Sequence, residues 1–345
     1  MTVNTDKDDQ PMTLVTLNDL HTARQRLESV LSRTSLLRAP WASCGHRSLF
    51  LKPENLQITG SFKIRGAYNR LSRMSAAQKA RGVIARSSGN HGKALAYAAR
   101  QDGVKATIVM PSTAAKVKID GVLEYGADVR FASPEECPAL TEQLAAEHGY
   151  VTVPPFDDLD IIAGQGTVGL DISDEAVAAG LDIGTVLVPV SGGGLISGVA
   201  AALKLTHPGI RVVGVEPELA ADAGESLRAG RRVTWPTERV SRTIADGLRM
   251  TTVGEHTFEH MRVFVDDIIT VTEEEICSSV ALLARRAGMI VEPSGAVTTA
   301  AYLYHERDLP AAGGHVALIS GGNVDPDLFE LLRKEAPLPF QTCRG

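Results

Sequence analysis

The sequence predicts an α/β fold with open, twisted parallel sheets and flanking helices, arranged as two domains. The chain has 345 residues, enough to bury two modest hydrophobic cores. From Val83 to Val153, short apolar runs alternate with segments of helical periodicity, and a second, larger series of the same kind begins at Ile161. Such alternation is typical of βαβ units and of a parallel sheet.

The N-terminal third contributes two helices and a strand to this prediction. A helix is expected over Leu17–Leu31 with Asn18 as its cap, and the apolar run Ser48–Leu51 is expected to be a strand. Ser61 is a suitable N-cap for a second helix, which runs through Asn69 and reaches about Met74.

The first alternating series is short and ends at two consecutive prolines, Pro154 and Pro155. Its expected strands are Val83–Ala85, Ala106–Met110, Asp128–Phe131 and Tyr150–Val153, and its expected helices are His91–Arg100, Lys116–Tyr125 and Pro134–His148. We expect residues 76–160 to form a small domain inserted into a large domain made of residues 1–75 and 161–345.

The second series supplies most of that large domain. Its expected strands are Val186–Val190, Arg211–Val215, Val263–Thr270 and Val316–Ser320. Its expected helices are Thr167–Ala179, one that starts at Leu195, Glu273–Ala287, Ser294–Tyr304 and Pro326–Lys334.

Composition excludes several functional classes. A formal net charge of -6 argues against a nucleic-acid-binding protein, which would carry a basic face. No segment approaches the length of a membrane-spanning helix, and residues 2–10 are too acidic and polar for a secretory signal. Cys44, Cys137, Cys277 and Cys343 are scattered without metal-ligand spacing, so neither a disulfide framework nor a zinc site is expected. This cysteine usage fits a reducing cytoplasm.

Lys63 is the first candidate for chemistry. It lies in the first turn of the predicted helix, where the helix dipole disfavours a cation, and Arg65 is close by. Both effects favour the neutral amine, which is the nucleophile required for a Schiff base with a carbonyl compound. A solvated surface lysine is the alternative.

The stretch Thr59-Gly60-Ser61-Phe62-Lys63-Ile64-Arg65-Gly66-Ala67 resembles the cofactor-lysine motif of the fold-type II pyridoxal-phosphate enzymes, in particular the threonine dehydratase and serine racemase group. The resemblance runs from about residue 50 to residue 323. It implies the two-domain, tryptophan synthase beta-like fold with pyridoxal 5′-phosphate between the domains. It also implies that Lys63 carries the cofactor, with Phe62 beside it.

A glycine-rich turn follows the predicted strand at Val186–Val190. Ser191-Gly192-Gly193-Gly194-Leu195 places backbone N–H groups at the start of a helix, where an anion is stabilised. Ser197 occupies the third glycine position of the dinucleotide-binding pattern, so that pattern is not satisfied. The turn resembles the family's phosphate cradle, and the resemblance assigns Gly192, Gly193, Gly194 and Leu195 to the cofactor phosphate.

Ser87-Ser88-Gly89-Asn90-His91-Gly92 lies at another strand-to-helix turn. From the residues alone it is a capped turn with Asn or Ser as N-cap. The resemblance implies more, because it places the substrate carboxylate on the turn formed by Ser87, Ser88, Gly89, Asn90 and His91. It also implies that Asn90 contacts the 3′-oxygen of the cofactor and that Ser88 faces the ring opposite Lys63.

Three further positions are assigned to the cofactor by resemblance. Ser320, in Ile319-Ser320-Gly321-Gly322-Asn323, is expected at the pyridine nitrogen, and Glu292 is expected near the same ring. A serine hydroxyl at the pyridine nitrogen makes the ring a weaker electron acceptor than a carboxylate at that position would, and a weaker acceptor suits β-elimination. Gly247, in Thr243-Ile244-Ala245-Asp246-Gly247, is expected to present backbone to the cofactor. For Glu292, a surface acid beside a helix is the alternative.

An acidic cluster follows the predicted strand at Arg211–Val215. Glu216, the Ala220 carbonyl and Asp222 resemble a divalent-cation site of several family members. Oxygen ligands suit Mg²⁺ or Ca²⁺. A pair of solvated acids is an equal alternative.

The resemblance implies an L-threonine or L-serine dehydratase that releases 2-oxobutanoate or pyruvate and ammonia. Serine racemase is one alternative, and a dehydratase of another β-hydroxy amino acid such as 3-hydroxyaspartate is a second. A ligand carrier that kept the fold without catalysis is a third. The expected partners are a small amino-acid substrate and copies of the same chain, as a dimer or tetramer, with no nucleic acid and no membrane.

Overall fold

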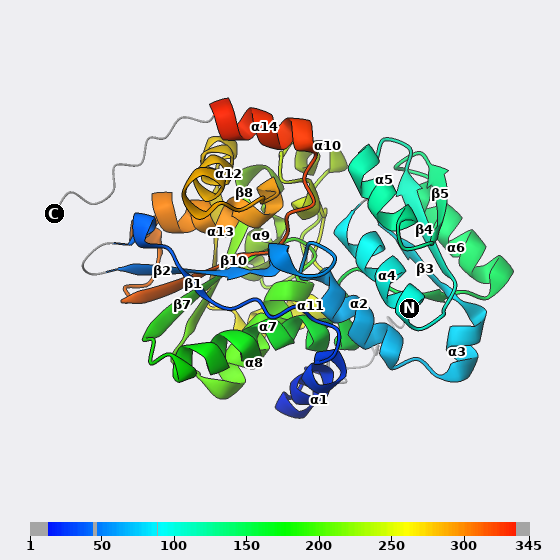
Figure 1. Ribbon diagram of the computed structural model, residues 1–345, viewed down its shortest axis with the longest axis horizontal. Coiled ribbons are helices and arrows are strands. Elements are labelled where there is room, and N and C mark those ends of the chain that lie inside the picture. The colour runs from blue at the N-terminus through cyan, green and yellow to red at the C-terminus, as the bar shows by residue number, and fades with distance from the viewer. Residues whose placement is uncertain (1–12, 44–46, 88, 336–345) are drawn as a thin grey trace, which may run out of the picture.

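The computed structural model describes residues 13–43, 47–87 and 89–335, and its strands form two sheets (Figure 1). The larger sheet has six strands in the order β1-β2-β10-β7-β8-β9. Its members are β1 (Leu37–Arg38), β2 (Ser48–Pro53), β7 (Ile183–Pro189), β8 (Arg211–Pro217), β9 (Asp267–Val271) and β10 (Gly314–Ile319). All neighbours pair in parallel except β1 with β2.

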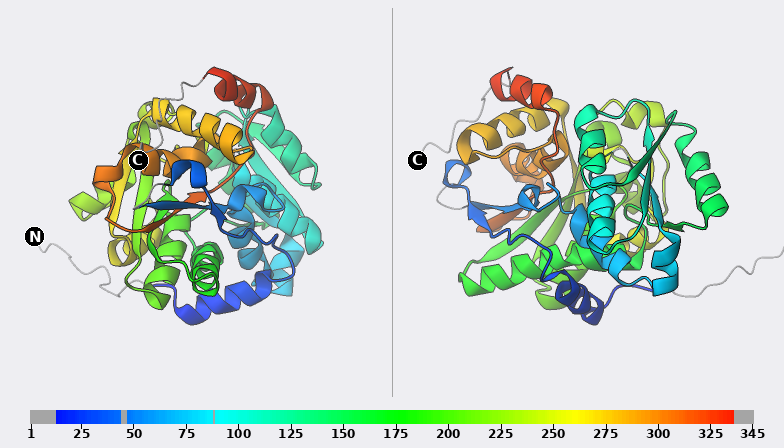
Figure 2. Two further views of the ribbon diagram at one scale, coloured as in Figure 1. Left: turned by 60° about the vertical axis from the view of Figure 1, so that its left-hand side comes forward. Right: turned by 45° about the vertical axis from the view of Figure 1, so that its right-hand side comes forward.

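Helices cover both faces of the larger sheet (Figures 1 and 2). Successive side chains of a strand point to opposite faces, and in this sheet the side chains on both faces are apolar, so both faces have to be covered. In β10, Ala317 and Ile319 pack toward α12, α13 and α14, whereas Val316 and Leu318 pack toward α7, α8 and α11. These helices are α7 (Leu159–Ala178), α8 (Gly194–Thr206), α11 (Glu255–Phe264), α12 (Glu273–Ala287), α13 (Pro293–Tyr304) and α14 (Pro326–Glu335). The remaining helices of this part are α1 (Leu17–Leu27), α9 (Asp222–Ala229) and α10 (Thr237–Val240).

The smaller sheet has four parallel strands in the order β5-β4-β3-β6. Its strands are β3 (Val83–Arg86), β4 (Ala106–Pro111), β5 (Asp128–Ala132) and β6 (Val151–Thr152), and its helices are α3 (Ala76–Arg81), α4 (Asn90–Gln101), α5 (Lys116–Leu123) and α6 (Cys137–His148). Val83 and Ala85 pack with α4 and α5, whereas Ile84 packs against the α6 face. The predicted α/β class with parallel sheets is confirmed, and the domain boundaries at residues 76 and 160 stay a prediction.

Helix α2 (Lys63–Ser72) lies between the two sheets along the chain, and glycines of α7 and α8 let α2, α7 and α8 pack closely together (Figure 1). A Cβ on Gly164 of α7 would lie 2.6 Å from the Arg65 carbonyl oxygen, and one on Gly166 would lie 2.8 Å from the Gly198 carbonyl oxygen of α8. The same segment of α7 holds α2 through Gln165, whose Oε1 accepts from the Gly66 N–H at 3.2 Å. The stretch Ala163–Thr167 therefore packs helices together.

Two predicted caps are wrong. Helix α1 begins after Thr16, whose hydroxyl accepts from the Asp19 N–H, and it ends at Leu27 rather than Leu31. Asn18 is therefore inside the helix. Ser61 is not a helix cap. Its backbone forms an isolated antiparallel β-bridge with Gly321, and its hydroxyl is buried without a hydrogen-bond partner among the described residues. The N-cap of α2 is Phe62, which makes no side-chain cap.

Two predicted boundaries in the second series are also wrong. Helix α7 begins at Leu159 rather than Thr167, because Asp158 caps it and its glycines serve packing rather than helix termination. The run Val263–Thr270 is not one strand, since Val263 and Phe264 end helix α11 and β9 begins at Asp267. Phe258 and Met261 of α11 are buried three residues apart, which is helical spacing.

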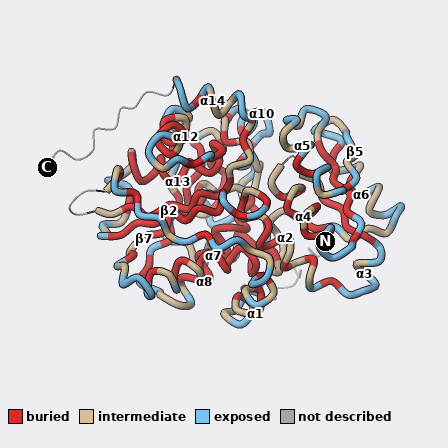
Figure 3. The backbone as a smooth tube through the Cα atoms, viewed as in Figure 1, coloured by how far each residue is buried: buried red, intermediate tan, exposed pale blue. Residues whose placement is uncertain are grey.

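A buried ionic network fixes α2 in its place. The Arg65 guanidinium donates to both Glu54 carboxylate oxygens, at 2.7 and 2.8 Å, and to the Thr167 hydroxyl at 2.9 Å. Its Nη2 also lies 2.8 Å from an Asp171 oxygen of α7. Arg65 and Glu54 are both fully buried, in the interior that Figure 3 colours red. Burial raises the pKa of the Glu54 carboxyl, but the charge and hydrogen bonds of Arg65, the charge of Lys52 and the Thr34 hydrogen bond together outweigh it and lower that pKa below its ordinary value.

We expect Arg65→Met to lower the free energy of unfolding by about 3–5 kcal/mol, because it leaves the Glu54 carboxylate buried without its partner. Chemical denaturation measures the change. The control is Arg73→Met, which removes an exposed pair with Asp160 and should cost at most about 1 kcal/mol. The double variant Glu54→Gln/Arg65→Met should recover part of the loss. Equal effects of the two single variants would contradict the structural role of Arg65.

Candidate active site

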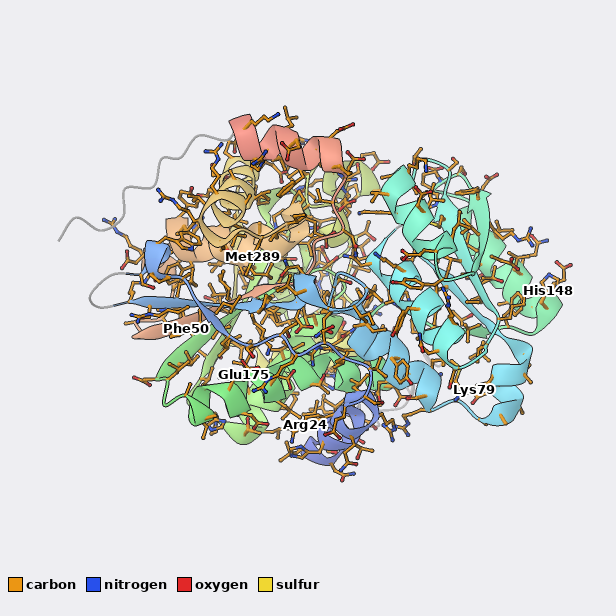
Figure 4. All side chains as sticks on the ribbon, viewed as in Figure 1. Arg24, Phe50, Lys79, His148, Glu175 and Met289 are labelled. Atoms are coloured by element: carbon orange, nitrogen blue, oxygen red, sulfur yellow. The ribbon has the colours of Figure 1, made fainter. Side chains whose placement is uncertain are left out.

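A cavity of 390 Å³ lies where the carboxyl ends of strands from both sheets meet. In parallel α/β sheets this edge is the usual ligand site, and the volume is within the range of small-molecule sites. Its lining residues are Phe62, Lys63, Arg86, Ser87, Gly89, Asn90, His91, Pro111, Lys118, Pro134, Cys137, Pro155, Phe156, Pro189, 191–195, 246–250, Glu292, Ser294 and Ser320. Figure 4 draws the described side chains of the whole molecule on the ribbon.

Lys63 is the first residue of α2, and its side chain enters the cavity. Its Nζ donates to the Pro155 carbonyl oxygen at 2.6 Å. Burial lowers the pKa of this amine to about 8. The predicted direction is therefore confirmed, but the predicted influence of Arg65 is wrong, because the Arg65 guanidinium is directed into its ion pairs with Glu54 and Asp171.

The glycine turn at 191–195 connects β7 to α8 and forms one wall of the cavity. Gly193 has a φ of +95°, which L side chains rarely adopt. A Cβ on Gly192 would lie 2.4 Å from the Phe156 ring, so the close approach of Phe156 also requires glycine. The first N–H groups of α8 have no intrahelical acceptors, and the positive end of the helix dipole lies there. The turn is therefore suited to an anionic group.

The turn after β3 forms the opposite wall. The Ser87 hydroxyl accepts from the N–H groups of Gly89 and Gly92, at 3.2 and 2.9 Å, and so shapes the turn before α4. His91 is buried, and its Nε2 lies 3.0 Å from the Val153 carbonyl oxygen. Burial lowers the pKa of His91 to about 3, which keeps the ring neutral. Ser88 lies outside the described residues.

Asn90 and Glu292 meet inside the cavity. The Asn90 amide donates to Glu292 Oε1 at 2.6 Å, and the Asn323 amide donates to Asn90 Oδ1 at 2.7 Å. Lys93 donates to Asn323 at 3.1 Å, outside the cavity lining. Glu292 is buried, so it is not a surface acid, and burial raises its pKa to about 7. Its Oε2 is buried and has no hydrogen-bond partner in the described part of the chain.

Ser320 and Gly247 lie on the same side of the cavity as Glu292. Ser320 follows the last residue of β10, and its hydroxyl lies 3.4 Å from the Ser294 carbonyl oxygen. The Gly247 N–H donates to the Ser294 hydroxyl at 2.9 Å, so this backbone is held at the cavity wall. Of the cofactor and substrate residues named from the sequence, every one that the structure describes lines the cavity.

Several lining residues were not found from the sequence. Lys118 of α5 forms an ion pair with Asp246, which joins the two sides of the cavity. Arg86, at the end of β3, and Cys137, at the start of α6, also line the cavity. The available signal was that Arg86 ends a strand directly before the Ser87 turn, which places it at the functional edge of the sheet. Cys137 and Cys277 are free thiols.

The acidic cluster at 216–222 lies outside the cavity lining. Glu216 ends β8 and accepts from the N–H groups of Ala223 and Gly224, at 3.0 and 2.9 Å, while Asp222 begins α9. Both acids are buried, so they are not solvated caps, and burial raises the pKa of Glu216 to about 8 and that of Asp222 to about 7. No group of three His, Cys, Asp or Glu side chains suited to a metal occurs within the described ranges.

The cavity fits a flat, anionic carbonyl cofactor. It combines the Lys63 amine with its lowered pKa, a helix start at 191–195 that is suited to an anion, and a Glu292 carboxyl oxygen without a hydrogen-bond partner among the described residues. Each of these groups lacks something that such a cofactor supplies: a carbonyl carbon, a phosphate and a polar ring substituent.

No helix within the described ranges is long and apolar enough to cross a membrane.

Comparison with known proteins agrees with this geometry. The chain is 41% identical over 318 residues to the catabolic L-threonine dehydratase TdcB of Staphylococcus aureus strain N315, covering 90% of each chain. Among solved structures it is similar to a threonine deaminase from T.th., with 42% identity, a TM-score of 0.84, and coverage of 90% of this chain and 99% of that one. It is also similar to maize serine racemase, with 35% identity, a TM-score of 0.87, and coverage of 92% and 96%. Residues 27–321 match the family described as pyridoxal-phosphate dependent enzyme, and the chain belongs to that family.

Proposed function

We propose that the protein is a pyridoxal-phosphate dependent ammonia-lyase that dehydrates L-threonine and L-serine to 2-oxobutanoate and pyruvate, with release of ammonia. The observation that carries this proposal is the partly buried Lys63 amine, with a pKa of about 8, in a cavity that also contains the helix start at 191–195. The identity of 41% with a catabolic L-threonine dehydratase supports this choice of reaction.

The cofactor would be held by residues from both sides of the cavity. Lys63 would bind its carbonyl carbon, with Phe62 beside it, and the N–H groups at 192–195 would bind its phosphate. Asn90 and Glu292 would contact ring substituents, Ser320 the ring nitrogen, and Gly247 the ring edge. When bound, the cofactor withdraws electrons from the α-carbon of an amino acid.

The protein residues would then orient the substrate and move one proton. The turn at 87–91 would bind the α-carboxylate through N–H groups and hydroxyls, which fixes the α-carbon next to Lys63. The Lys63 amine would take the α-proton as general base, and its lowered pKa keeps part of it neutral near pH 7. Ser320 would present only a hydroxyl to the ring nitrogen, and a hydroxyl would stabilise a proton there less than a carboxylate would.

Serine racemase is the second candidate, and the TM-score of 0.87 with maize serine racemase favours keeping it. Racemisation needs an acid on the face opposite Lys63, and the sequence offers Ser88 for that role. Dehydration of an L-amino acid needs only the Lys63 face. We further propose a cytoplasmic homo-oligomer, a dimer or tetramer, with residues 76–160 as the inserted domain and no nucleic-acid or membrane partner.

Divalent-cation binding by Glu216, the Ala220 carbonyl and Asp222 is also proposed. Asp222 Oδ2 is buried without a hydrogen-bond partner among the described residues, and burial raises the pKa of both acids, which shifts each toward its neutral form. A Mg²⁺ or Ca²⁺ ion would supply the missing positive charge.

The rate of cofactor uptake should depend on the protonation of Lys63. Because only the neutral amine reacts, the growth rate of the visible absorption band should rise about tenfold per pH unit below pH 8 and level off above it. Rapid mixing of cofactor-free protein with pyridoxal phosphate between pH 6.5 and 9.5 measures this. Lys63→Ala should give neither the band nor borohydride trapping, whereas Lys116→Ala, at an exposed lysine, should behave as wild type. A rate still rising at pH 9.5 would show an ordinary lysine.

The cofactor-loaded protein should form 2-oxobutanoate from L-threonine and pyruvate from L-serine, measured as oxo acid with equimolar ammonia. Chiral chromatography of the same L-serine reactions scores D-serine. Ser88→Ala should abolish any D-serine formation and keep much of the L-threonine dehydration, because the alanine removes only the hydroxyl. Efficient transamination without either oxo acid would overturn the dehydratase proposal.

Mg²⁺ or Ca²⁺ at about a hundredfold excess over Kd should stabilise the chelator-treated protein by about 2.7 kcal/mol through binding to the folded state alone. Thermal unfolding should then shift upward by roughly 5 °C. Asp222→Asn should remove the shift, whereas Glu218→Gln, at the exposed neighbouring acid, should keep it. An unchanged melting temperature in the wild type would leave Glu216 and Asp222 as a buried acid pair.

A further inference from the structure

Arg86 is a cavity residue without a hydrogen-bond or ion-pair partner among the described residues, and its charge interacts with the Cys137 thiol. It is the last residue of β3, it lines the cavity, and its side chain is exposed there. No hydrogen bond or ion pair within the described ranges involves its guanidinium. A guanidinium without such partners has five free N–H donors in one plane. Two parallel N–H groups of this plane can bind the two oxygens of a carboxylate.

The other cavity cations are all engaged. Lys63 donates to the Pro155 carbonyl oxygen at 2.6 Å, and Lys118 is paired with Asp246. Arg249 donates from Nε and Nη2 to the Thr243 carbonyl oxygen, at 2.9 and 2.5 Å. An incoming anion can therefore bind the Arg86 guanidinium without breaking an existing contact.

Arg86 and the proposed phosphate site belong to different sheets. Arg86 belongs to the small sheet, whereas the glycine turn at 191–195 follows β7 of the large sheet. Along β3, Ile84 and Arg86 share the face that packs on α6, where Pro134 and Cys137 line the cavity. Arg86 also directly precedes Ser87, in the turn proposed to hold the α-carboxylate. Its guanidinium is therefore placed for the substrate end of the cavity.

We propose that Arg86 binds a second carboxylate on the substrate, so that the enzyme prefers β-hydroxy amino acids with an acidic side chain. The inference rests on the proposed dehydratase function and names its substrate class. For 3-hydroxyaspartate, the Cα–H and Cβ–OH bonds break and water leaves. Hydrolysis of the resulting enamine then releases ammonia and a four-carbon oxo diacid, with no net oxidation.

The test compares kcat/KM for L-threo-3-hydroxyaspartate, L-serine and L-threonine in the cofactor-loaded wild type, Arg86→Met and Arg130→Met. Arg130, on β5, is an exposed arginine outside the cavity lining and is the matched control. The wild type should prefer the diacid to L-serine by about tenfold or more. Arg86→Met should lose about ten- to hundredfold on the diacid, the usual effect of a lost charge-assisted pair, and less than about threefold on L-serine. Arg130→Met should match the wild type.

A binding measurement separates this inference from the proposed function. L-Aspartate and L-alanine lack the β-hydroxyl, so they bind without dehydration and can be titrated by the change in the visible cofactor spectrum. L-Aspartate should bind the wild type at least about tenfold more tightly than L-alanine does, and Arg86→Met should abolish the difference. If no substrate gives an oxo acid but aspartate still binds selectively, the dehydratase proposal fails and the role of Arg86 stands.

Three results would overturn the inference. Equal losses on all three substrates would place Arg86 on the α-carboxylate. Weakened cofactor binding in Arg86→Met would place it on the cofactor. No preference for the diacid, together with no difference between L-aspartate and L-alanine, would make Arg86 a solvated cation.

Discussion

The bidentate pair between Arg65 and Glu54 is the interaction on which the arrangement of the site depends. Glu54 follows β2, Arg65 lies in the first turn of α2, and Asp171 of α7 completes the contact, so one guanidinium joins three elements. Lys63 is two residues from Arg65 on the same helix, and the rotation that buries Arg65 directs Lys63 into the cavity. Removing such a charge from water is costly, and the neighbouring pair of Lys52 with Glu175, at 2.9 Å, belongs to the same buried region (Figure 4 labels Glu175).

Close helix packing is the second constraint, and it explains the glycines of α7. Gly164 lets α7 approach the backbone of α2, and Gly166 meets Gly198 of α8 on the other side. Helix α8 begins at the glycine turn and α2 begins at Lys63, so the three helices set how far the proposed phosphate site lies from the amine. The glycines lower the intrinsic helix propensity of α7, but burial along its length outweighs that cost.

Much of the fold could be predicted from the sequence, because strands buried on both faces are continuous apolar runs between helices. The start of α7 could not, since glycines that serve packing look like helix breakers until their neighbours are known. Serine commonly caps helices, which favours Ser61 as a cap, but tertiary pairing with Gly321 decides its position. For the site, motifs indicated Lys63, Asn90 and Ser320, whereas Lys118 and Arg86 needed the structure, because their roles depend on which strands end side by side.

One physical effect, exclusion of water, acts in opposite directions on the two central titratable groups of the cavity. Burial lowers the pKa of the Lys63 amine to about 8 and raises that of the Glu292 carboxyl to about 7, so both are moved toward their neutral forms. A neutral amine can attack a carbonyl carbon, and a neutral carboxyl can donate a hydrogen bond from Oε2, which has no partner within the described ranges. Bound anions, such as a phosphate and a substrate carboxylate, favour the protonated forms of both groups. In the proposed reaction, ligand binding would therefore make Lys63 a stronger base than it is in the empty cavity, at the stage when the α-proton has to be removed.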